Sequence, residues 1–138
     1  MIYQQEISVR TSGRRTYEIT EQLHDIVATS GIKTGLCHVY IMHTSCSLFI
    51  NENADPSVQY DLVQYLNRLV PENDPAYTHI FEGADDMPAH IKSAILPASL
   101  GVPVIRGRLK LGTWQGVFVW EHRTIPHNRH VIVTVMGD

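Results

Sequence analysis

Residues 85–92, Asp-Asp-Met-Pro-Ala-His-Ile-Lys, place two carboxylates, an imidazole and an amine within one short stretch. Pro88 fits the first helical position and Asp86 the N-cap, so a short helix is predicted to begin here. His90 and Lys92 would project from its first turns, and the unpaired N–H groups of the helix N-terminus favour a bound phosphate. Such residues are also common helix caps, and capping without chemistry is the alternative interpretation.

Two more polar groups follow predicted strands in the first half of the chain. Residues 43–45, His-Thr-Ser, could supply an imidazole ligand or base together with the hydroxyls of Thr44 and Ser45. Residues 51–53, Asn-Glu-Asn, with Asp55 offer carboxylate and amide oxygens that suit Mg²⁺ or a polar ligand. The alternatives are a satisfied strand end in the first case and a turn with a helix cap in the second.

The second half of the chain contributes a glycine-flanked tryptophan and a charged strand end. Within residues 112–116, Gly-Thr-Trp-Gln-Gly, the glycines could let a ligand approach the backbone while Trp114 stacks on its ring. A bulge with a core tryptophan would have the same sequence. In residues 121–123, Glu-His-Arg, strand alternation places His122 on one face and both neighbours on the other, where ion pairing accounts for them.

Three of the eight histidines, His43, His90 and His122, lie at the ends of predicted elements. Histidine is the commonest metal ligand. Together with carboxylates from Asp85 and Glu52, these imidazoles would suit Zn²⁺ or another divalent ion such as Mg²⁺. Their spacing matches no metal motif, so the site is a hypothesis about the folded protein. We expect no organic cofactor.

The composition is that of an ordinary globular domain. The 138 residues are 43% hydrophobic and carry a formal net charge of −3, with Arg14 and Arg15 as the only basic doublet. The acidic balance argues against a nucleic-acid partner or an anionic membrane. No apolar run reaches the roughly 18 residues of a membrane span, and no signal-peptide pattern opens the chain. We expect one domain, residues 1–138, in the cytoplasm, with Cys37 and Cys46 as reduced core thiols.

Hydrophobic periodicity predicts about three helices and about eight short, mostly antiparallel strands, which is an α+β arrangement. The helices are expected near residues 21–30, 56–70 and 88–96, and the second should bury Val58, Leu62, Leu66 and Leu69. Strands are expected at residues 2–10, 17–19, 35–43, 45–51, 102–106, 112–123 and 130–136. The first two strands should form a hairpin, and both faces of residues 35–43 should be mostly covered.

Four motifs taken together resemble one known family. They are residues 43–48 followed by 51–56, residues 83–92, residues 112–116 and residues 121–123. In this order they closely resemble the YjbQ family, also called secondary thiamine-phosphate synthases. The resemblance extends from the first strand to the terminal Gly137-Asp138, and Cys46 stands where the family often has alanine.

The resemblance implies a compact α+β subunit with a sandwich-like core that assembles as a homotrimer around a threefold axis. Sites between subunits would allow His43, His90 and His122 to converge from different chains. It also implies a weak thiamine-phosphate synthase activity, which joins a hydroxymethylpyrimidine diphosphate to a hydroxyethylthiazole phosphate with loss of diphosphate.

For that reaction, Asp85, Asp86 or Glu52 would hold Mg²⁺, and Lys92 with the helix N-terminus would neutralise the leaving group. His90 could protonate the departing oxygen. We therefore assign catalytic roles to His90, Asp86 and Lys92. The residues expected to bind substrate are Thr44, Ser45, Asn51, Trp114 and Gln115.

Two other functions fit the same residues. A metal-dependent hydrolase of a small phosphorylated substrate would use them to activate water. A non-catalytic trimer would use them to bind a small anion. Product analysis distinguishes the two enzymes, and tight binding without turnover would favour the binding protein.

Overall fold

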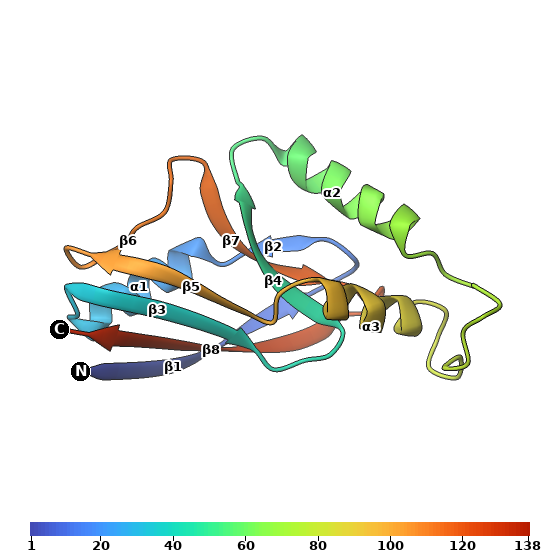
Figure 1. Ribbon diagram of the computed structural model, residues 1–138, viewed down its shortest axis with the longest axis horizontal. Helices are drawn as coiled ribbons and strands as arrows, with labels where there is room; N and C mark the ends of the chain where they lie inside the picture. The colour runs from blue at the N-terminus through green and yellow to red at the C-terminus, as the bar shows by residue number, and fades with distance from the viewer.

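The computed structural model covers all 138 residues and contains eight strands and three helices, so the α+β prediction is confirmed (Figure 1). In chain order the elements are β1 (Ile2–Thr11), β2 (Thr16–Glu18), α1 (Thr20–Ser30), β3 (Thr34–Ile41), β4 (Cys46–Glu52), α2 (Pro56–Leu69), α3 (Asp86–Ile95), β5 (Ser99–Ile105), β6 (Arg108–Leu109), β7 (Gln115–Glu121) and β8 (His127–Gly137).

The strands form two antiparallel sheets. One has five strands in the order β1-β8-β3-β5-β6, and the other has three in the order β2-β7-β4. The main core contains the inward side chains of both sheets and of α1, among them Val39, Val133, Leu48 and Val119. Both termini lie together at one end of the molecule, and α3 lies at the other (Figure 1).

Helix α1 follows the predicted amphipathic pattern. Leu23, Ile26 and Val27 are buried, and Gly31 ends the helix in a left-handed conformation with φ of 71°. The backbone N–H of Gly31 donates to the carbonyl of Ala28, which satisfies one of the last carbonyls. Thr20 is the first helical residue, and its hydroxyl accepts the N–H of Val117.

Helix α2 begins as predicted, because the Asp55 carboxylate accepts the N–H of Ser57 and Pro56 occupies the first turn. The predicted buried side of α2 was partly wrong. Val63 and Leu66 are buried, whereas Leu69 is 57% exposed. The helix packs along a narrow stripe against a second core cluster of aromatic side chains on the three-stranded sheet, which includes Phe49, Phe118 and Trp120.

The predicted hairpin between the first two strands was wrong. β1 pairs with β8, whereas β2 pairs with β7 through Thr16 opposite Trp120. The turn at Gly13 therefore carries the chain from the five-stranded sheet to the three-stranded one. A three-residue strand contains too little pattern to specify which sheet it joins.

The outer face of the five-stranded sheet is partly exposed, so the expectation that both faces of residues 35–43 are mostly covered was also wrong. Tyr40 is 46% exposed, and Leu36 pairs with Met136 on the same open face. Cys37, by contrast, faces inward as a free, buried thiol, as does Cys46 on β4. None of the three helices has the length and hydropathy required to cross a membrane.

Candidate metal site

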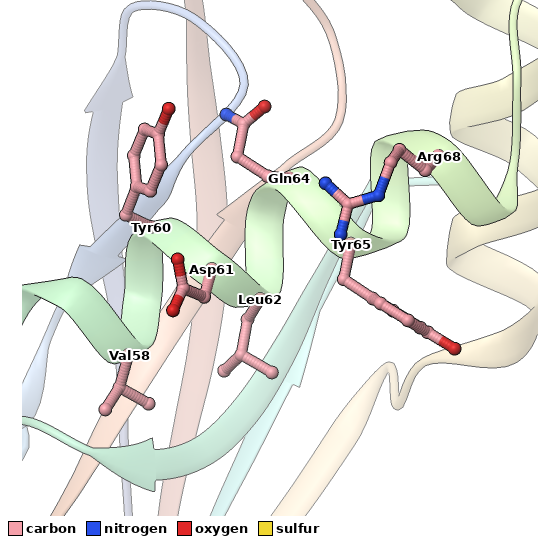
Figure 2. Close-up of a pocket in the computed structure, with 7 residues that line it drawn as sticks. All are labelled: Val58, Tyr60, Asp61, Leu62, Gln64, Tyr65 and Arg68. Carbon is pink, nitrogen blue, oxygen red and sulfur yellow. The ribbon is translucent and has the colours of Figure 1, made fainter.

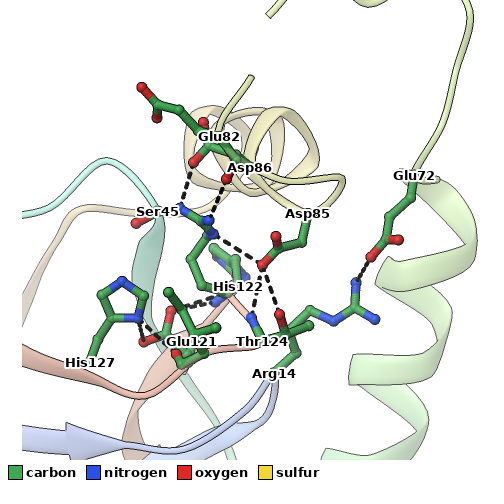
Figure 3. Close-up of polar contacts among 12 residues, drawn as sticks. Arg14, Ser45, Glu72, Glu82, Asp85, Asp86, Glu121, His122, Thr124 and His127 are labelled. Carbon is green, nitrogen blue, oxygen red and sulfur yellow. Dashed lines mark hydrogen bonds and ion pairs between the residues drawn. The ribbon is translucent and has the colours of Figure 1, made fainter. Parts of the chain in front are cut away.

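The predicted helix at the acidic octet is present, with a different cap. α3 begins at Asp86, one residue after Asp85, and Asp85 makes no side-chain capping bond. The Asp85 carboxylate instead accepts hydrogen bonds from Arg123 Nε at 3.0 Å and from the Thr124 N–H at 2.8 Å (Figure 3). Asp85 thus attaches the start of α3 to the end of β7, so its predicted role as a metal ligand is not supported within one chain.

Asp86 is 2% exposed and lies between an arginine and two histidines. Its Oδ1 accepts a hydrogen bond from Arg123 at 2.7 Å. Its Oδ2 lies 2.8 Å from His79 Nε2 and 3.3 Å from His90 Nε2. Burial opposes ionisation of Asp86, but the bond from His79 and the charges of Arg123 and His90 outweigh it and lower the pKa of the carboxyl.

The ligand atoms of His79, Asp86 and His90 all lie within 4.8 Å of one another. Zinc–nitrogen and zinc–oxygen bonds of about 2 Å separate neighbouring ligands of a tetrahedral site by roughly 3.3 Å, so small side-chain movements would admit an ion. The two imidazoles are partly exposed, with side-chain exposures of 47% and 35%. Three protein ligands with an accessible fourth position are typical of a catalytic rather than a structural site.

Glu82 is a further acid beside His79. Its Oε2 lies 3.8 Å from His79 Nε2, and its side chain is 64% exposed. Its backbone carbonyl accepts a hydrogen bond from Arg123, so the same arginine holds both the loop before α3 and the helix itself. Glu82 can therefore supply a fourth ligand or a base beside the cluster.

The structure brings only His90 of the predicted metal-binding histidines to this cluster. His43 Nε2 accepts the backbone N–H of His130 at 2.9 Å, and its Nδ1 faces the Arg129 guanidinium at 3.4 Å. A cation at Nδ1 would be repelled by that guanidinium. Within one chain, the structure therefore places His43 away from the α3 cluster, and its metal role stays a prediction.

His122 is also held elsewhere. It is 1% exposed, its Nε2 lies 2.9 Å from the Ser47 hydroxyl, and its Nδ1 is buried without a partner. Burial, together with the charge of Lys92, lowers its pKa to about 3, so the ring is neutral at pH 7. Glu52, the remaining predicted ligand, accepts the N–H of Asp55 at 3.3 Å, where it supports the turn before α2.

Lys92, which was predicted to neutralise a leaving group, points into the protein. It is 1% exposed, and its Nζ donates to Asn67 Oδ1 of α2 at 2.6 Å. Burial, followed by the charge of Arg14, lowers its pKa to about 8. The side chain lies on the opposite side of α3 from solvent, so it cannot reach a ligand at the histidine cluster without leaving this position.

The residues predicted to bind substrate divide between the two ends of the three-stranded sheet. Cys46 pairs with Glu121 at one end and Glu52 with Gln115 at the other, a separation of six residues or about 20 Å. Thr44 and Ser45 precede the first end, where the Ser45 hydroxyl accepts a bond from Arg129.

Asn51, Trp114 and Gln115 lie at the far end of that sheet. The Asn51 side chain accepts the N–H of Glu52, and the Gln115 side chain accepts the N–H of Gly112, so both side chains bond to nearby backbone. Trp114 is 63% exposed. A single subunit therefore does not gather the five predicted substrate-binding residues into one pocket.

Sequence reasoning missed His79 and Glu82, because no helix or strand is expected between residues 70 and 88. The signal was the spacing of His79, Glu82, Asp86 and His90, which places acids and imidazoles three or four residues apart leading into a helix.

A buried ion pair between Glu121 and Arg129 was missed as well. Arg129 Nε and Nη2 both donate to the Glu121 carboxylate, which also accepts the hydroxyl of Thr11 and the N–H groups of His122 and Arg123. These bonds outweigh burial and lower the pKa of Glu121. The available signal was alternation along β8, since Arg129 shares the inward face of Val131 and Val133.

A hollow of about 660 Å³ runs along α2, away from these groups. Figure 2 shows that its lining side chains all come from this one helix and point in several directions, with Tyr60 and Gln64 on one side and Val58 and Leu62 on the other. It contains no histidine or cysteine, so it offers no comparable metal or acid–base chemistry.

The fold and the sequence of this chain both agree with one family. A profile described as "UPF0047 protein YjbQ-like" matches residues 5–138. The chain belongs to the YjbQ-like UPF0047 family. A UPF0047 protein of Synechocystis is 50% identical over 136 residues, which cover 99% of this chain and 92% of the relative. The UPF0047 protein YjbQ of Salmonella typhimurium is 45% identical over 139 residues, with 100% of each chain covered.

Solved structures of YjbQ-like proteins have the same fold. A YjbQ/UPF0047 family protein of Clostridium acetobutylicum has a TM-score of 0.88 and 36% identity, covering 95% of this chain and 98% of its own. A protein of Sulfolobus solfataricus has a TM-score of 0.87 and 26% identity, with 100% of each chain covered, and is described as of unknown function.

These names correct one expectation from the sequence. The YjbQ-like relatives are described by family and not as thiamine-phosphate synthases, and the Sulfolobus protein is assigned no activity. The designation of this chain as a thiamine-phosphate synthase and transferase was therefore wrong. The α+β architecture expected from the same resemblance is confirmed.

Proposed function

We propose that this YjbQ-like protein is a metal-dependent hydrolase of a small phosphorylated substrate, with the ion held by His79, Asp86 and His90. The observation that supports it is the meeting of two half-exposed imidazoles on one oxygen of a buried carboxylate. A divalent ion bound there would lower the pKa of a water molecule and polarise a phosphoryl oxygen. The N-terminus of α3 adds a positive dipole end beside the same groups.

The surrounding residues have distinct roles in this proposal. Arg123 holds Asp86 through Oδ1, which leaves Oδ2 directed at the two histidines. Glu82 is exposed and close to His79, so it accepts the proton of the attacking water. Asp85 orients Arg123 and thereby acts as a positioning residue.

Metal analysis with phosphatase assays tests the proposal. Protein stripped with EDTA and reloaded separately with Zn²⁺, Mn²⁺ or Mg²⁺ should bind one ion per chain and hydrolyse p-nitrophenyl phosphate. Replacing Glu82 by Gln should preserve metal binding and lower turnover by about 10²- to 10⁴-fold, as expected for loss of a general base.

The matched control is His24→Gln, which removes an imidazole on α1, away from the cluster. It should change neither metal binding nor turnover. Tight binding of phosphate by the metal-loaded protein without turnover would replace the hydrolase with the anion-binding alternative. A protein that takes up no ion would exclude both forms of the proposal.

We also propose that the chain forms a homotrimer in the cytoplasm. The partly exposed outer face of the five-stranded sheet presents Tyr40, Leu36 and Met136, and exposed apolar patches of this kind commonly form interfaces. Two free, buried cysteines are compatible with a reducing compartment. Light scattering should give a trimer mass, and Tyr40→Lys should shift it towards the monomer. A wild-type monomer would exclude the assembly.

A further inference from the structure

A separate cavity of about 350 Å³ lies between the start of β2 and α2. Arg14, Arg15 and Thr16 line one side, and Gln59, Tyr60 and Gln64 line the other. None of these residues belongs to the histidine cluster. The volume falls at the lower end of the range of small-molecule sites, and the lining combines polar side chains with apolar surface that includes Val63.

The loop that carries both arginines is fixed by one tyrosine. The Tyr17 hydroxyl accepts the N–H of Ser12 at 2.7 Å and Arg15 Nε–H at 3.1 Å, and it donates to the carbonyl of Gly13 at 3.1 Å. Gly13 has a φ of 96°, which a side chain would disfavour. The arginine backbone is thus held before any ligand arrives, which lowers the entropic cost of binding.

Both guanidinium groups retain donors for a ligand. Arg14 makes one side-chain hydrogen bond, at 2.8 Å to Glu72, and both partners are partly exposed (Figure 3). Such a pair is weak enough for an anion to compete with it. Arg15 uses only Nε, towards Tyr17, and its guanidinium lies 5.2 Å from the centre of that ring. Paired guanidinium forks suit phosphate in particular, because they can donate several parallel bonds.

The side chain of Gln59 contains a hydrogen-bond acceptor to which no group donates. Its Nε2 donates to the carbonyl of Glu52 at 2.8 Å, which fixes the orientation of the amide. Its Oε1 is buried and has no hydrogen-bond partner. An acceptor in that state is costly unless another group donates to it. Because Oε1 is closed to solvent, a small movement of the Gln59 side chain is needed before a ligand hydroxyl or N–H can bond to it.

We propose that this cavity binds a small phosphate monoester that also bears a hydrogen-bond donor. The phosphate pairs with Arg14 and Arg15, and the donor bonds to Gln59 Oε1. A second basic hollow, which includes Arg106, Arg108 and Lys110, has no buried acceptor without a partner. The combination of two cations and an unsatisfied acceptor therefore distinguishes the Arg14–Arg15 cavity, independently of any hydrolysis at α3.

Calorimetric titration of EDTA-treated, full-length protein tests the proposal, since removal of metal prevents phosphate from binding through an ion at α3. The probes are glycerol 3-phosphate and n-propyl phosphate, which share a three-carbon chain and differ in hydroxyl donors. Glycerol 3-phosphate should bind about tenfold more tightly, as expected for one additional hydrogen bond to a buried acceptor. Arg15→Gln should lower the affinity for both probes by about tenfold or more.

Two variants provide the matched comparisons. Gln59→Leu should remove the preference for glycerol 3-phosphate while leaving n-propyl phosphate binding nearly unchanged. Arg108→Gln removes a cation beside the other hollow and should have no effect. Equal loss of binding in Arg15→Gln and Arg108→Gln would overturn the site, as would absence of saturable binding in wild type. Equal affinity of wild type for the two probes would overturn the role of Gln59.

Discussion

Asp86 and Glu121 are both almost completely buried, and both accept hydrogen bonds from an arginine, yet their surroundings differ. Glu121 is surrounded by fixed donors from Arg129, Thr11 and the backbone. Asp86 has one oxygen held by Arg123, while the other faces only imidazoles. An imidazole can release its proton and bind an ion, whereas an arginine cannot. A buried carboxylate therefore stabilises the fold in one region and faces ionisable imidazoles in the other.

Removing the arginine of the buried pair should have the largest effect. Arg129→Met leaves the Glu121 carboxylate buried without its cation, which should cost about 3–5 kcal/mol of the free energy of unfolding. Urea denaturation measures this loss. The double variant Glu121→Leu/Arg129→Met should recover most of it, because no unpaired charge remains. A loss below about 1 kcal/mol in the single variant would contradict the structural role of the pair.

Replacing a histidine at the open site should affect metal binding rather than folding. His90→Gln should lower the affinity for Zn²⁺ by at least about 100-fold. Loss of a residue that only orients a metal ligand already lowers metal affinity by about 10- to 100-fold. Its metal-free stability should change by less than about 1 kcal/mol, since the ring is partly exposed. Competition with a chromophoric chelator and urea denaturation report the two quantities. Unchanged Zn²⁺ affinity would remove His90 from the site.

The free energy of unfolding should depend on pH through Lys92, and we expect this effect to be of intermediate size. Its folded pKa of about 8 lies below the ordinary value of 10.5, so the unfolded chain binds the proton more tightly. The resulting destabilisation is fully present below pH 8 and disappears as pH rises from about 8 towards 10.5. The wild type should gain about 2 kcal/mol over this range relative to Lys92→Met, measured by urea denaturation at several pH values. A parallel pH profile in the two proteins would contradict the shift.

Substitution in an exposed ion pair should have the smallest effect on the free energy of unfolding. It provides the reference against which the effect of the buried pair is judged. His130 Nδ1 lies 3.4 Å from Glu6 Oε2, with side-chain exposures of 37% and 50%. Glu6→Gln should change the free energy of unfolding by less than about 0.5 kcal/mol. Thermal denaturation at low and high salt should show nearly the same small difference. A larger cost would contradict the expectation that solvent-exposed ion pairs contribute little to the free energy of unfolding of this protein.

Most elements could be predicted because their signals are local. Gly31 ends α1, Asp55 with Pro56 begins α2, and alternation along β3 identifies Cys37 and Val39 as inward-facing residues. The exceptions depend on contacts distant in sequence. β2 pairs with β7 instead of β1, and the narrow contact of α2 with its sheet leaves Leu69 exposed.

The candidate site was less predictable than the fold. Asp86 and His90 could be selected because a helix places residues four apart on one face. His79 could not be assigned to them in this way, because it lies in an irregular segment whose path depends on Arg123, two residues after the end of β7. For the same reason, residue types alone could not show that His43 is hydrogen-bonded to the backbone of His130. Nor could they show that His122 is hydrogen-bonded to the Ser47 hydroxyl.

The sequence by itself determined the family, the α+β class and the chemical groups available to the protein, since periodicity, caps and motifs are local properties of the chain. Only the tertiary structure decided which of those groups meet. It gave Asp86 and Glu121 different partners, directed Lys92 into the interior and brought His79 to α3. Proximity between residues far apart in sequence depends on how sheets and helices pack, and that packing is a property of the whole chain.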